Sequence, residues 1–201
     1  MPQPAEVLLT LDPVVRDVLE RTRALQQGHF LLTSGRHSAL YFQAMSLLQH
    51  PEFGAMAATA AARHFENVRI DTTFAPAVGG IVWGHLVAQY LPRARAIFAE
   101  RVEGHMALRR GFTFEPGEQV LLAEDVVTTG GSVMELRGLA EAAGAQVTGL
   151  AAVLDRSGGT FDAGVPFFSW AQLAIETWPP DQCPLCREGS VAVKPGSRGL
   201  G

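Results

Sequence analysis

The sequence contains a single lysine, Lys194, so its positive charge is carried almost entirely by arginine. Acidic residues also outnumber basic ones, 20 against 16. Proteins that bind nucleic acid nonspecifically accumulate lysine and arginine against the phosphate backbone, and this chain has no such surplus. The composition argues against a general nucleic-acid surface. It predicts that an anionic ligand is bound locally, by the planar and permanently charged arginine side chain.

Long hydrophobic runs are missing as well. No apolar segment of the sequence reaches the roughly 18 residues that a membrane span requires. The first residues, "MPQPAEVLLTLDPVV", lack a basic region followed by a long apolar core. We therefore expect a cytoplasmic protein that does not associate with membranes.

Cysteine is scarce: the sequence has two, Cys183 and Cys186, in the stretch "CPLCREG". A structural zinc ion normally takes four ligands, and the sequence offers no second cysteine pair. The prediction is a pair of reduced structural thiols and no metal held by the protein alone. A metal shared across a dimer and a redox pair stay open as alternatives.

The length of 201 residues and the even mixture of apolar and polar segments predict one domain over residues 1–201. Residues 1–50 are expected to form a small N-terminal helix and hairpin, which we call the hood. Its helix should begin at Asp12–Pro13 and continue to Gly28. The two apolar runs around Ser34-Gly35-Arg36 read as a hairpin or as a strand and loop, and we expect the hairpin. Residues 183–201, the tail, are rich in Gly, Pro and Ser toward their end and are expected to fray.

The middle of the sequence alternates short apolar runs with helical patterns. A helix is expected from Pro51, and the segments after it read in turn as strand, helix, strand, strand, helix and strand: "TTFAPAV", "IVWGHLVAQYL", "RAIFAE", "QVLLAED", "SVMELRGLAEAAG" and "QVTGLAAVLD". This order predicts the α/β class, with a parallel central sheet flanked by helices on both faces. The polar segment "RVEGHMALRRGFTFEPGE" should form a mobile loop or a hairpin over the sheet edge.

Ligands of open parallel sheets collect beyond the carboxyl ends of the strands, which here predicts three loops. They span residues 75–80, 124–132 and 154–159. The second, "VLLAEDVVTTGGS", combines a small-residue loop before a helix, suited to a phosphate, with the two carboxylates of Glu124 and Asp125. The lysine of a Walker A loop and a Gly-x-Gly-x-x-Gly fingerprint are both missing from the sequence. A sugar phosphate accounts for both halves, because carboxylates accept hydrogen bonds from ribose hydroxyls beside the bound phosphate.

The same stretch resembles the phosphoribosyl diphosphate (PRPP) motif of type I phosphoribosyltransferases. Further segments resemble the orotate phosphoribosyltransferases within that family: "GHFLLTSGRHSALYFQ", "FAERVEGHMALRRGF", "VLDRSGG" and "CPLCREGSVAVKPGSR". The resemblance implies the type I phosphoribosyltransferase fold and Mg²⁺-dependent transfer of ribose 5-phosphate from PRPP to orotate, in pyrimidine synthesis. It also implies a homodimer in which a flexible loop of one subunit serves the active site of the other.

Site residues follow from the resemblance position by position. It implies catalytic roles for Arg101, His105 and Asp125, and base contacts for Thr128, Arg156, Tyr41 and Phe42. The Mg²⁺ is expected to arrive with PRPP and not through dedicated ligands. The residues implied in binding PRPP are Arg101, His105, Arg109, Glu124, Asp125, Val126, Val127, Thr128, Thr129, Gly130, Gly131 and Ser132.

The sequence departs from the family pattern where lysines are common. Thr33 and Gly79 stand at two such positions, and the loop "ERVEGHMALRR" has none. We hypothesise that Arg101, Arg109 and Arg110 supply the missing charge to the diphosphate, with His105 as a further donor. The alternative is a solvated basic face with little effect.

Two other functions share these motifs. One is a phosphoribosyltransferase acting on another base, and the other is a PRPP-sensing regulator on the same fold. A regulator of nucleic acid should carry a basic surface or an added binding segment, which the sequence does not indicate.

Overall fold

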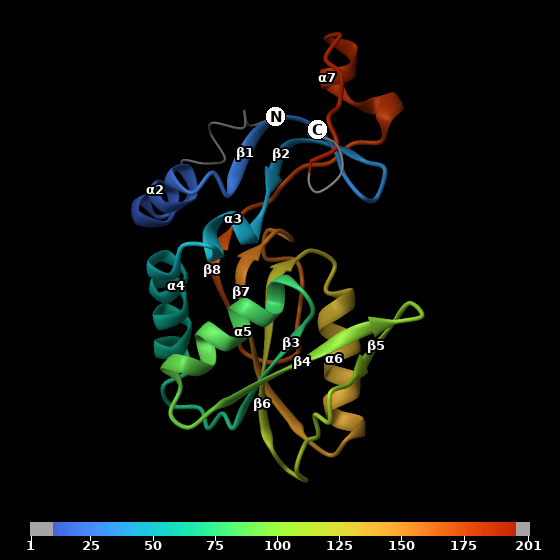
Figure 1. Cartoon of the computed structure of the whole chain (residues 1–201). Coiled ribbons are helices and arrows are strands. Elements are labelled where there is room, and N and C mark those ends of the chain that lie inside the picture. The colour runs from blue at the N-terminus through green and yellow to red at the C-terminus, as the bar shows by residue number, and fades with distance from the viewer. Residues whose placement is uncertain (1–9, 196–201) are drawn as a thin grey trace.

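The computed structural model describes residues 10–195, and its centre is a six-stranded sheet in the order β5-β4-β3-β6-β7-β8 (Figure 1). The five strands from β4 to β8 along this order are parallel, and β5 runs antiparallel to β4 at the edge. This architecture confirms the predicted fold class. The strands span Thr72–Pro76 (β3), Arg95–Val102 (β4), His105–Leu108 (β5), Gln119–Val127 (β6), Gln146–Asp155 (β7) and Phe167–Gln172 (β8).

Helices cover both faces of the sheet, as predicted (Figure 1). Helices α4 (Pro51–His64) and α5 (Gly79–Tyr90) lie on one face, and α6 (Gly131–Ala142) lies on the other. The alternation of side chains along β6 explains the two layers: Leu121 packs with Trp83 of α5, while Leu122 packs with Leu136 of α6. These four side chains are at most 1% exposed, and burying each one contributes about 1.5–3 kcal/mol before the cost of ordering the chain.

The hood lies at one end of the sheet and consists of α2 (Pro13–Arg21), β1 (Leu25–Leu31) and β2 (His37–Phe42) (Figure 1). Asp12 caps α2 by accepting hydrogen bonds from the backbone N–H groups of Val14 and Val15, at 2.8 and 3.3 Å. The prediction that this helix continues to Gly28 is wrong. Arg23 has φ of 53°, which ends the helix, and the residues from Leu25 onward pair with β2. The predicted hairpin is confirmed, with Gly35 in its turn at φ of 77°.

The tail is ordered along residues 183–195, where the sequence predicted fraying. It contains the short helix α7 (Pro184–Arg187), and Val193 forms a parallel bridge with β1. The N–H of Val193 donates to the carbonyl of His29 at 2.8 Å, and the N–H of Leu31 donates to the carbonyl of Val193 at 2.9 Å. The backbone of a tail held in this way is satisfied, which is why it does not fray. Residues 196–201, also predicted to fray, lie outside the described residues.

The polar segment after β4 forms a hairpin, one of its two predicted alternatives. Val102 pairs with His105, and the two residues between them, Glu103 and Gly104, have φ of 49° and 89°. Positive φ at both central residues is typical of the tight turns that join twisted antiparallel strands. This segment, which we call the arginine hairpin (residues 101–110), extends from the sheet edge (Figure 1).

The remaining described helices are the short α3 (Ala44–Leu48) and the 3₁₀ turn η1 (Pro180–Gln182). Within residues 10–195, none of the helices is long and apolar enough to cross a membrane.

Candidate functional site

Three loops meet where the central strands end, beneath the hood. An added Cβ on Gly79, in the turn after β3, would lie 2.0 Å from Oδ2 of Asp125 on β6. The N–H of Arg156, after β7, donates to the carbonyl of Val127 at the end of β6 at 2.8 Å. Parallel strands thus bring the 75–80, 124–132 and 154–159 loops together, as the sequence predicted.

The loop after β6 has the backbone of an anion cradle. Gly130 caps α6 with φ of 77°, and a Cβ there would lie 1.9 Å from the Phe161 ring. Only glycine has both the space and the freedom for this positive φ, so Gly130 sets the turn at the start of α6, whose first N–H groups have no carbonyl partner within the helix. Thr129 is exposed and Ser132 half-buried beside these groups. The unpaired first turn of a twelve-residue helix favours a phosphate.

The acidic pair lies just before this loop and is unequally buried. Glu124 is 6% exposed, whereas Asp125 is half-buried. The backbone N–H of Asp125 donates to Glu124 Oε1 at 3.1 Å, and that of Val126 donates to Asp125 Oδ1 at 3.0 Å. Burial first, then a hydrogen bond and the charge of Asp125, raise the pKa of Glu124 to about 9. At neutral pH Glu124 is therefore protonated. A bound cation can displace this proton, and the carboxyl group can form a hydrogen bond with a ligand hydroxyl.

Gly79 is small because Asp125 fills the adjoining space. The 2.0 Å approach to Asp125 Oδ2 means that any larger residue there must move this carboxylate. A lysine at position 79, expected from the resemblance, would therefore require Asp125 to move. The neighbouring Ala77–Val78 peptide is cis.

A cavity of about 300 Å³ lies between the hood, the tail and the end of β7. Burial lowers the pKa of Arg156 from its ordinary value, and its guanidinium lies in the wall of this cavity. Tyr41 also lies in the wall, but the Phe42 side chain packs into the core, because neighbouring residues of a strand point to opposite faces. The lining residues are Leu31, Leu32, Thr33, Ser34, Tyr41, Arg156, Lys194 and Pro195.

Lys194 is the residue of this cavity whose place the sequence left undecided. It reaches the wall through the tail, held one residue earlier by the hydrogen bonds of Val193 to β1. Spacing carried no signal for this contact, since tail and hood lie at opposite ends of the sequence.

The arginines of the arginine hairpin form ion pairs with glutamates of the same chain. Arg101 donates to Gly104 O and, at 3.1 Å, to Glu135 Oε1 on α6. Arg110 donates to Glu100 at 2.6 Å, and Arg109 lies 3.9 Å from the same carboxylate. His105 is exposed. Within residues 10–195, no hydrogen bond or ion pair joins these four residues to the acidic pair or to the loop at 128–132.

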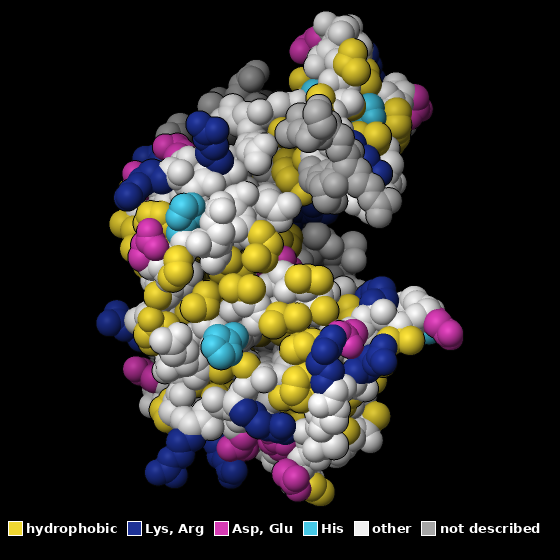
Figure 2. Space-filling view, viewed as in Figure 1, with side chains coloured by type: hydrophobic (Ala, Val, Ile, Leu, Met, Phe, Trp, Pro, Cys, Tyr) yellow, Lys and Arg dark blue, Asp and Glu magenta, His cyan; other side chains and the backbone are white. Residues whose placement is uncertain are grey.

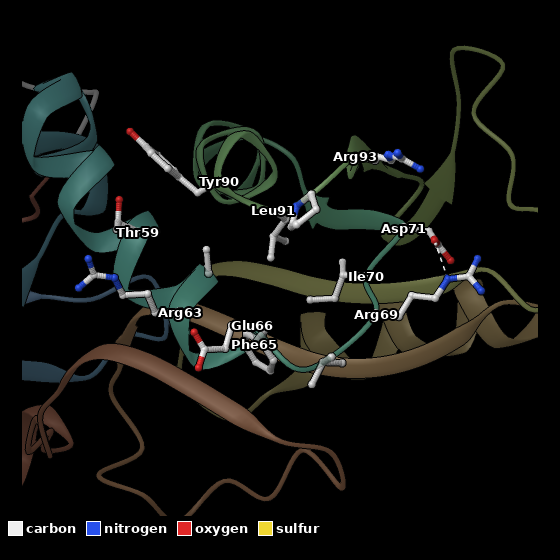
Figure 3. A pocket seen from close by; sticks show the side chains of 13 residues that line it. Thr59, Arg63, Phe65, Glu66, Arg69, Ile70, Asp71, Tyr90, Leu91 and Arg93 are labelled. Atoms are coloured by element: carbon white, nitrogen blue, oxygen red, sulfur yellow. Dashed lines mark hydrogen bonds and ion pairs between the residues drawn. The ribbon is translucent and has the colours of Figure 1, made fainter.

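A second cavity, of about 630 Å³, lies at the other end of the sheet (Figure 3). Asp71 and Arg93 in its wall precede β3 and β4, so it opens at the amino ends of the strands. Figure 3 shows Arg69 and Asp71 pointing toward each other, and they are joined at 3.0 Å. Asp71 also accepts a hydrogen bond from the N–H of Gln119 at 3.0 Å. This cavity contains none of the acidic pair, the glycine loop or Arg156, so the smaller one is the candidate site.

Four residues of the hood and tail could hold a metal ion: His29, His37, Cys183 and Cys186, whose ligand atoms all lie within 4.8 Å of one another. The sequence contains no second cysteine pair, and the two histidines that complete the set were not predicted. A signal was present, because His29 and His37 fall on the same face of the predicted hairpin.

Comparison with known proteins agrees with this geometry. The profile of the phosphoribosyl transferase domain family matches residues 43–164. The orotate phosphoribosyltransferase of Thermotoga maritima is 46% identical over 187 residues, which cover 93% of this chain and 100% of that protein. The crystal structure of orotate phosphoribosyltransferase from Aeropyrum pernix has a TM-score of 0.65 at 24% identity, covering 78% of this chain and 92% of that one. That of adenine phosphoribosyltransferase from Rhodothermus marinus has a TM-score of 0.63 at 21% identity, over 78% and 99%. Because enzymes named for two different bases share the fold, the fold alone does not select the base.

Proposed function

The chain belongs to the orotate phosphoribosyltransferase family, and on that premise we propose that it transfers ribose 5-phosphate from PRPP to orotate. A bond forms between N1 of orotate and C1 of the ribose as the bond from C1 to the diphosphate oxygen breaks, and the hydrogen on N1 leaves as a proton to pyrophosphate or solvent. The electron pair of the broken bond leaves with pyrophosphate, and the product is orotidine 5′-monophosphate. The observation that carries this proposal is one cavity, lined by Arg156 and Tyr41, at the same sheet end as the acidic pair and the glycine loop.

The loop and the acidic pair suit the two ends of the ribose phosphate. We assign the 5-phosphate to the loop at 128–132, where the N–H groups of α6 and the Thr and Ser hydroxyls are donors. Glu124 and Asp125 then accept hydrogen bonds from the ribose hydroxyls. As the ribose gains positive charge in the transition state, a carboxylate held nearby stabilises it, and a fixed carboxylate needs no reorganisation.

Mg²⁺ fits this donor set. The ion prefers carboxylate, phosphate and water oxygens, and Glu124 and Asp125 offer the first of these beside the loop. When bound with PRPP, Mg²⁺ would supply charge neutralisation of the diphosphate. The proton on Glu124 must leave for that residue to face a cation, so we expect PRPP binding with Mg²⁺ to release protons at neutral pH.

Arg156 supports orotate as the base because its fork matches a carboxylate with two parallel hydrogen bonds. Lys194 adds a second cation to the cavity wall, and Tyr41 an aromatic face. Uracil, hypoxanthine and adenine have no carboxylate for these cations. With such a base in the cavity, the half-buried Arg156 would have no anion to pair with. Because an unpaired buried charge is costly, these bases should bind more weakly than orotate.

Steady-state depletion of orotate, with uracil, hypoxanthine and adenine as competing bases, tests the proposal. We expect turnover of orotate alone, at least about a hundredfold loss of kcat/KM for Arg156→Ala, and only partial recovery in Arg156→Lys, which keeps charge but not the fork. Arg137→Ala, at an arginine of α6 paired with Glu141, is the matched control and should keep full activity. Turnover of another base with none on orotate would overturn the substrate assignment, and absence of any turnover would overturn the enzymatic one.

A homodimer is part of this proposal. An apolar hollow of about 350 Å³ lies between α5 and β4, lined by Ile81, Val82, Leu86 and Phe98 among others. Hydrophobic side chains gather over α5 on the face in Figure 2. Strand β4 continues directly into the arginine hairpin, and the Arg110 guanidinium lies 5.7 Å from the centre of the Phe98 ring. An exposed apolar surface beside the hairpin supports docking of a second copy here, with the hairpin extended toward the partner's site.

A further inference from the structure

Two histidines of the hood and two cysteines of the tail surround a common centre. His29 Nε2 lies 3.0 Å from His37 Nδ1 and 3.4 Å from Cys183 Sγ. Cys186 Sγ lies 3.3 Å from His37 Nδ1 and 3.8 Å from His29 Nε2. Both histidines and Cys183 are buried, and both cysteines are free thiols. Four potential ligand atoms therefore meet where the hood and the tail are otherwise joined by backbone hydrogen bonds, with Cys186 on the exposed side.

Hydrogen bonding alone does not explain this cluster. His29 Nε2 has three polar neighbours within 3.8 Å, yet a ring nitrogen carries one hydrogen or one lone pair and makes one good hydrogen bond. A thiol is in addition a weak donor and acceptor. The other ring nitrogen of His29, Nδ1, has no hydrogen-bond partner among residues 10–195, so the polar contacts of this ring all fall on Nε2. More polar contacts converge on His29 Nε2 than its single hydrogen bond can satisfy, which is the arrangement expected of metal ligands.

We propose that His29 Nε2, His37 Nδ1, Cys183 Sγ and Cys186 Sγ bind one Zn²⁺ ion. A tetrahedral zinc with ordinary bond lengths sets its ligands about 3.3 Å apart for two nitrogens, 3.6 Å for nitrogen and sulfur, and 3.8 Å for two sulfurs. The nitrogen pair at 3.0 Å and the nitrogen–sulfur pairs at 3.3, 3.4 and 3.8 Å are within about 0.3 Å of these lengths. The remaining two pairs, which involve Cys183 Sγ with His37 Nδ1 and with Cys186 Sγ, lie within 4.8 Å, so a shift of about 1 Å in the Cys183 side chain completes the tetrahedron.

The ligand set selects zinc and a structural role. Two imidazoles and two thiolates in a tetrahedron are the soft, mixed donors that zinc prefers over Mg²⁺ or Ca²⁺. Two thiolates also cancel the charge of a divalent ion, so the complete centre is neutral and can be buried at low cost. Since the protein fills all four positions, none is left for water or substrate, as in closed structural sites.

Local structure explains how distant residues form the site. The pairing of β1 with β2 is irregular between Gln27 and Phe30, and such a bulge re-aims the side chain of His29. Leu31 pairs with His37, so His29 and His37 are diagonal neighbours on one face. The two cysteines are brought together by the start of α7, whose first residue is Pro184.

The ion would fasten the tail to the hood beside the candidate base cavity. Cys183 and Cys186 lie before Val193, which bridges to β1, and before Lys194, which lines the cavity. The backbone contacts of Val193 are two hydrogen bonds, and each neutral hydrogen bond of this kind contributes only modestly to stability. A zinc site linking residues so far apart in the chain is far stronger, because its binding energy is gained only when hood and tail are folded together.

Metal content of the wild-type chain is the first test. After expression with zinc supplied and dialysis against metal-free buffer, elemental analysis should find about one zinc ion per chain. Replacing the zinc with Co²⁺ should give the visible absorption bands of a tetrahedral site together with a thiolate-to-cobalt band. Removal with a strong chelator should lower the Tm, and adding Zn²⁺ should restore it. A wild-type chain without zinc and without a cobalt spectrum would overturn the proposal.

Single substitutions locate the ion. Cys186→Ser and His37→Asn should each lose the bound zinc, and neither variant should show the cobalt spectrum of the wild-type site. The control is His85→Asn, which changes an exposed histidine of α5 and should retain one zinc per chain. If the cysteines instead form a disulfide, thiol titration of the native protein would find no free thiols and no zinc, which contradicts the site. Zinc content and spectra do not depend on turnover of orotate, so this proposal and the proposed function can fail separately.

Discussion

At the scale of single residues, Glu124 makes folding stability depend on pH in a definite direction. Its pKa is raised from 4.5 to about 9 by burial and by Asp125. The stability that depends on Glu124 being protonated is therefore fully present below pH 4.5 and is lost progressively as the pH rises toward 9. Between these values the unfolded chain ionises Glu124, whereas the folded chain keeps it protonated. Glu124→Gln keeps the shape and the oxygen that accepts the N–H of Asp125 but cannot ionise.

We expect Glu124→Gln to match the wild type near pH 5 and to exceed it at pH 9, by on the order of 1–3 kcal/mol. Urea unfolding of the free proteins at pH 5, 7 and 9 measures the difference. Glu141→Gln, on the exposed side of α6, should show the same small difference at all three values. A Glu124→Gln effect that does not grow with pH would contradict the raised pKa.

Residues of the site were predictable from sequence where they are neighbours in the chain. The acidic pair and the glycine loop lie within one continuous stretch, so their proximity needed no knowledge of the fold. The meeting of the two hood histidines with the tail cysteines, the place of Lys194 and the contact of Gly79 with Asp125 were not predictable, because each depends on segments brought together from elsewhere. Gly79 read as a missing lysine in the sequence, whereas the structure gives it a steric reason.

Elements were predictable where hydrophobic periodicity is strong. The strands β3, β6 and β7 and the helices α4 to α6 follow their patterns closely. The first helix was predicted too long, because apolar Leu25 fits both a helical face and a strand, and only pairing with Phe42 decides between them. Strand β8 was missed, since "FFSWAQ" lacks a clear alternation and is recognised only by its pairing with β7 at the sheet edge.

The arginine hairpin yields the prediction at this scale. Arg101 is paired with Glu135, and the hydrogen bond from Arg101 holds the pKa of Glu135 below its ordinary value, so the pair is ionised at neutral pH. To bind a diphosphate, Arg101 must leave that carboxylate. An exposed pair of this kind contributes about 0.2–1 kcal/mol. Glu135→Gln should therefore lower the KM for PRPP by up to about fivefold, while Arg101→Ala should lower kcat by at least about tenfold.

Steady-state kinetics with varied PRPP measures both effects. Glu141→Gln, which breaks the Arg137–Glu141 pair on the same helix, is the control and should leave both constants unchanged. If Arg101→Ala and Glu135→Gln both kept wild-type constants, the arginine hairpin would be a solvated surface without a part in PRPP binding.

At the scale of the whole molecule, the candidate base cavity depends on parts that the sequence places far apart. Arg156 comes from the end of β7, Tyr41 from the hood and Lys194 from the tail. The central sheet fixes only the first of these. The other two are positioned by the hairpin, by the bridge from Val193 and, in our proposal, by zinc. No periodicity in a single segment can predict such a cavity, because its geometry belongs to the packing of three segments.

A prediction about the homodimer distinguishes two possibilities: the arginine hairpin binds PRPP in the active site of its own chain, or in the active site of the partner chain. Arg101→Ala and Asp125→Asn should each have at most about a tenth of the wild-type activity as pure proteins. If the hairpin reaches across a homodimer, a mixed dimer contains one site with both defects and one with none. After subunit exchange in an equimolar mixture, about half of the dimers are mixed and half of their sites are intact, so about a quarter of the wild-type activity should return. Mixing Asp125→Asn with Arg156→Ala is the control, because both changes fall in the site built by a single chain and no pairing yields an intact one. Recovery only in the first mixture requires a shared hairpin; no recovery from a dimer proven by sedimentation would show that Arg101 acts within its own subunit.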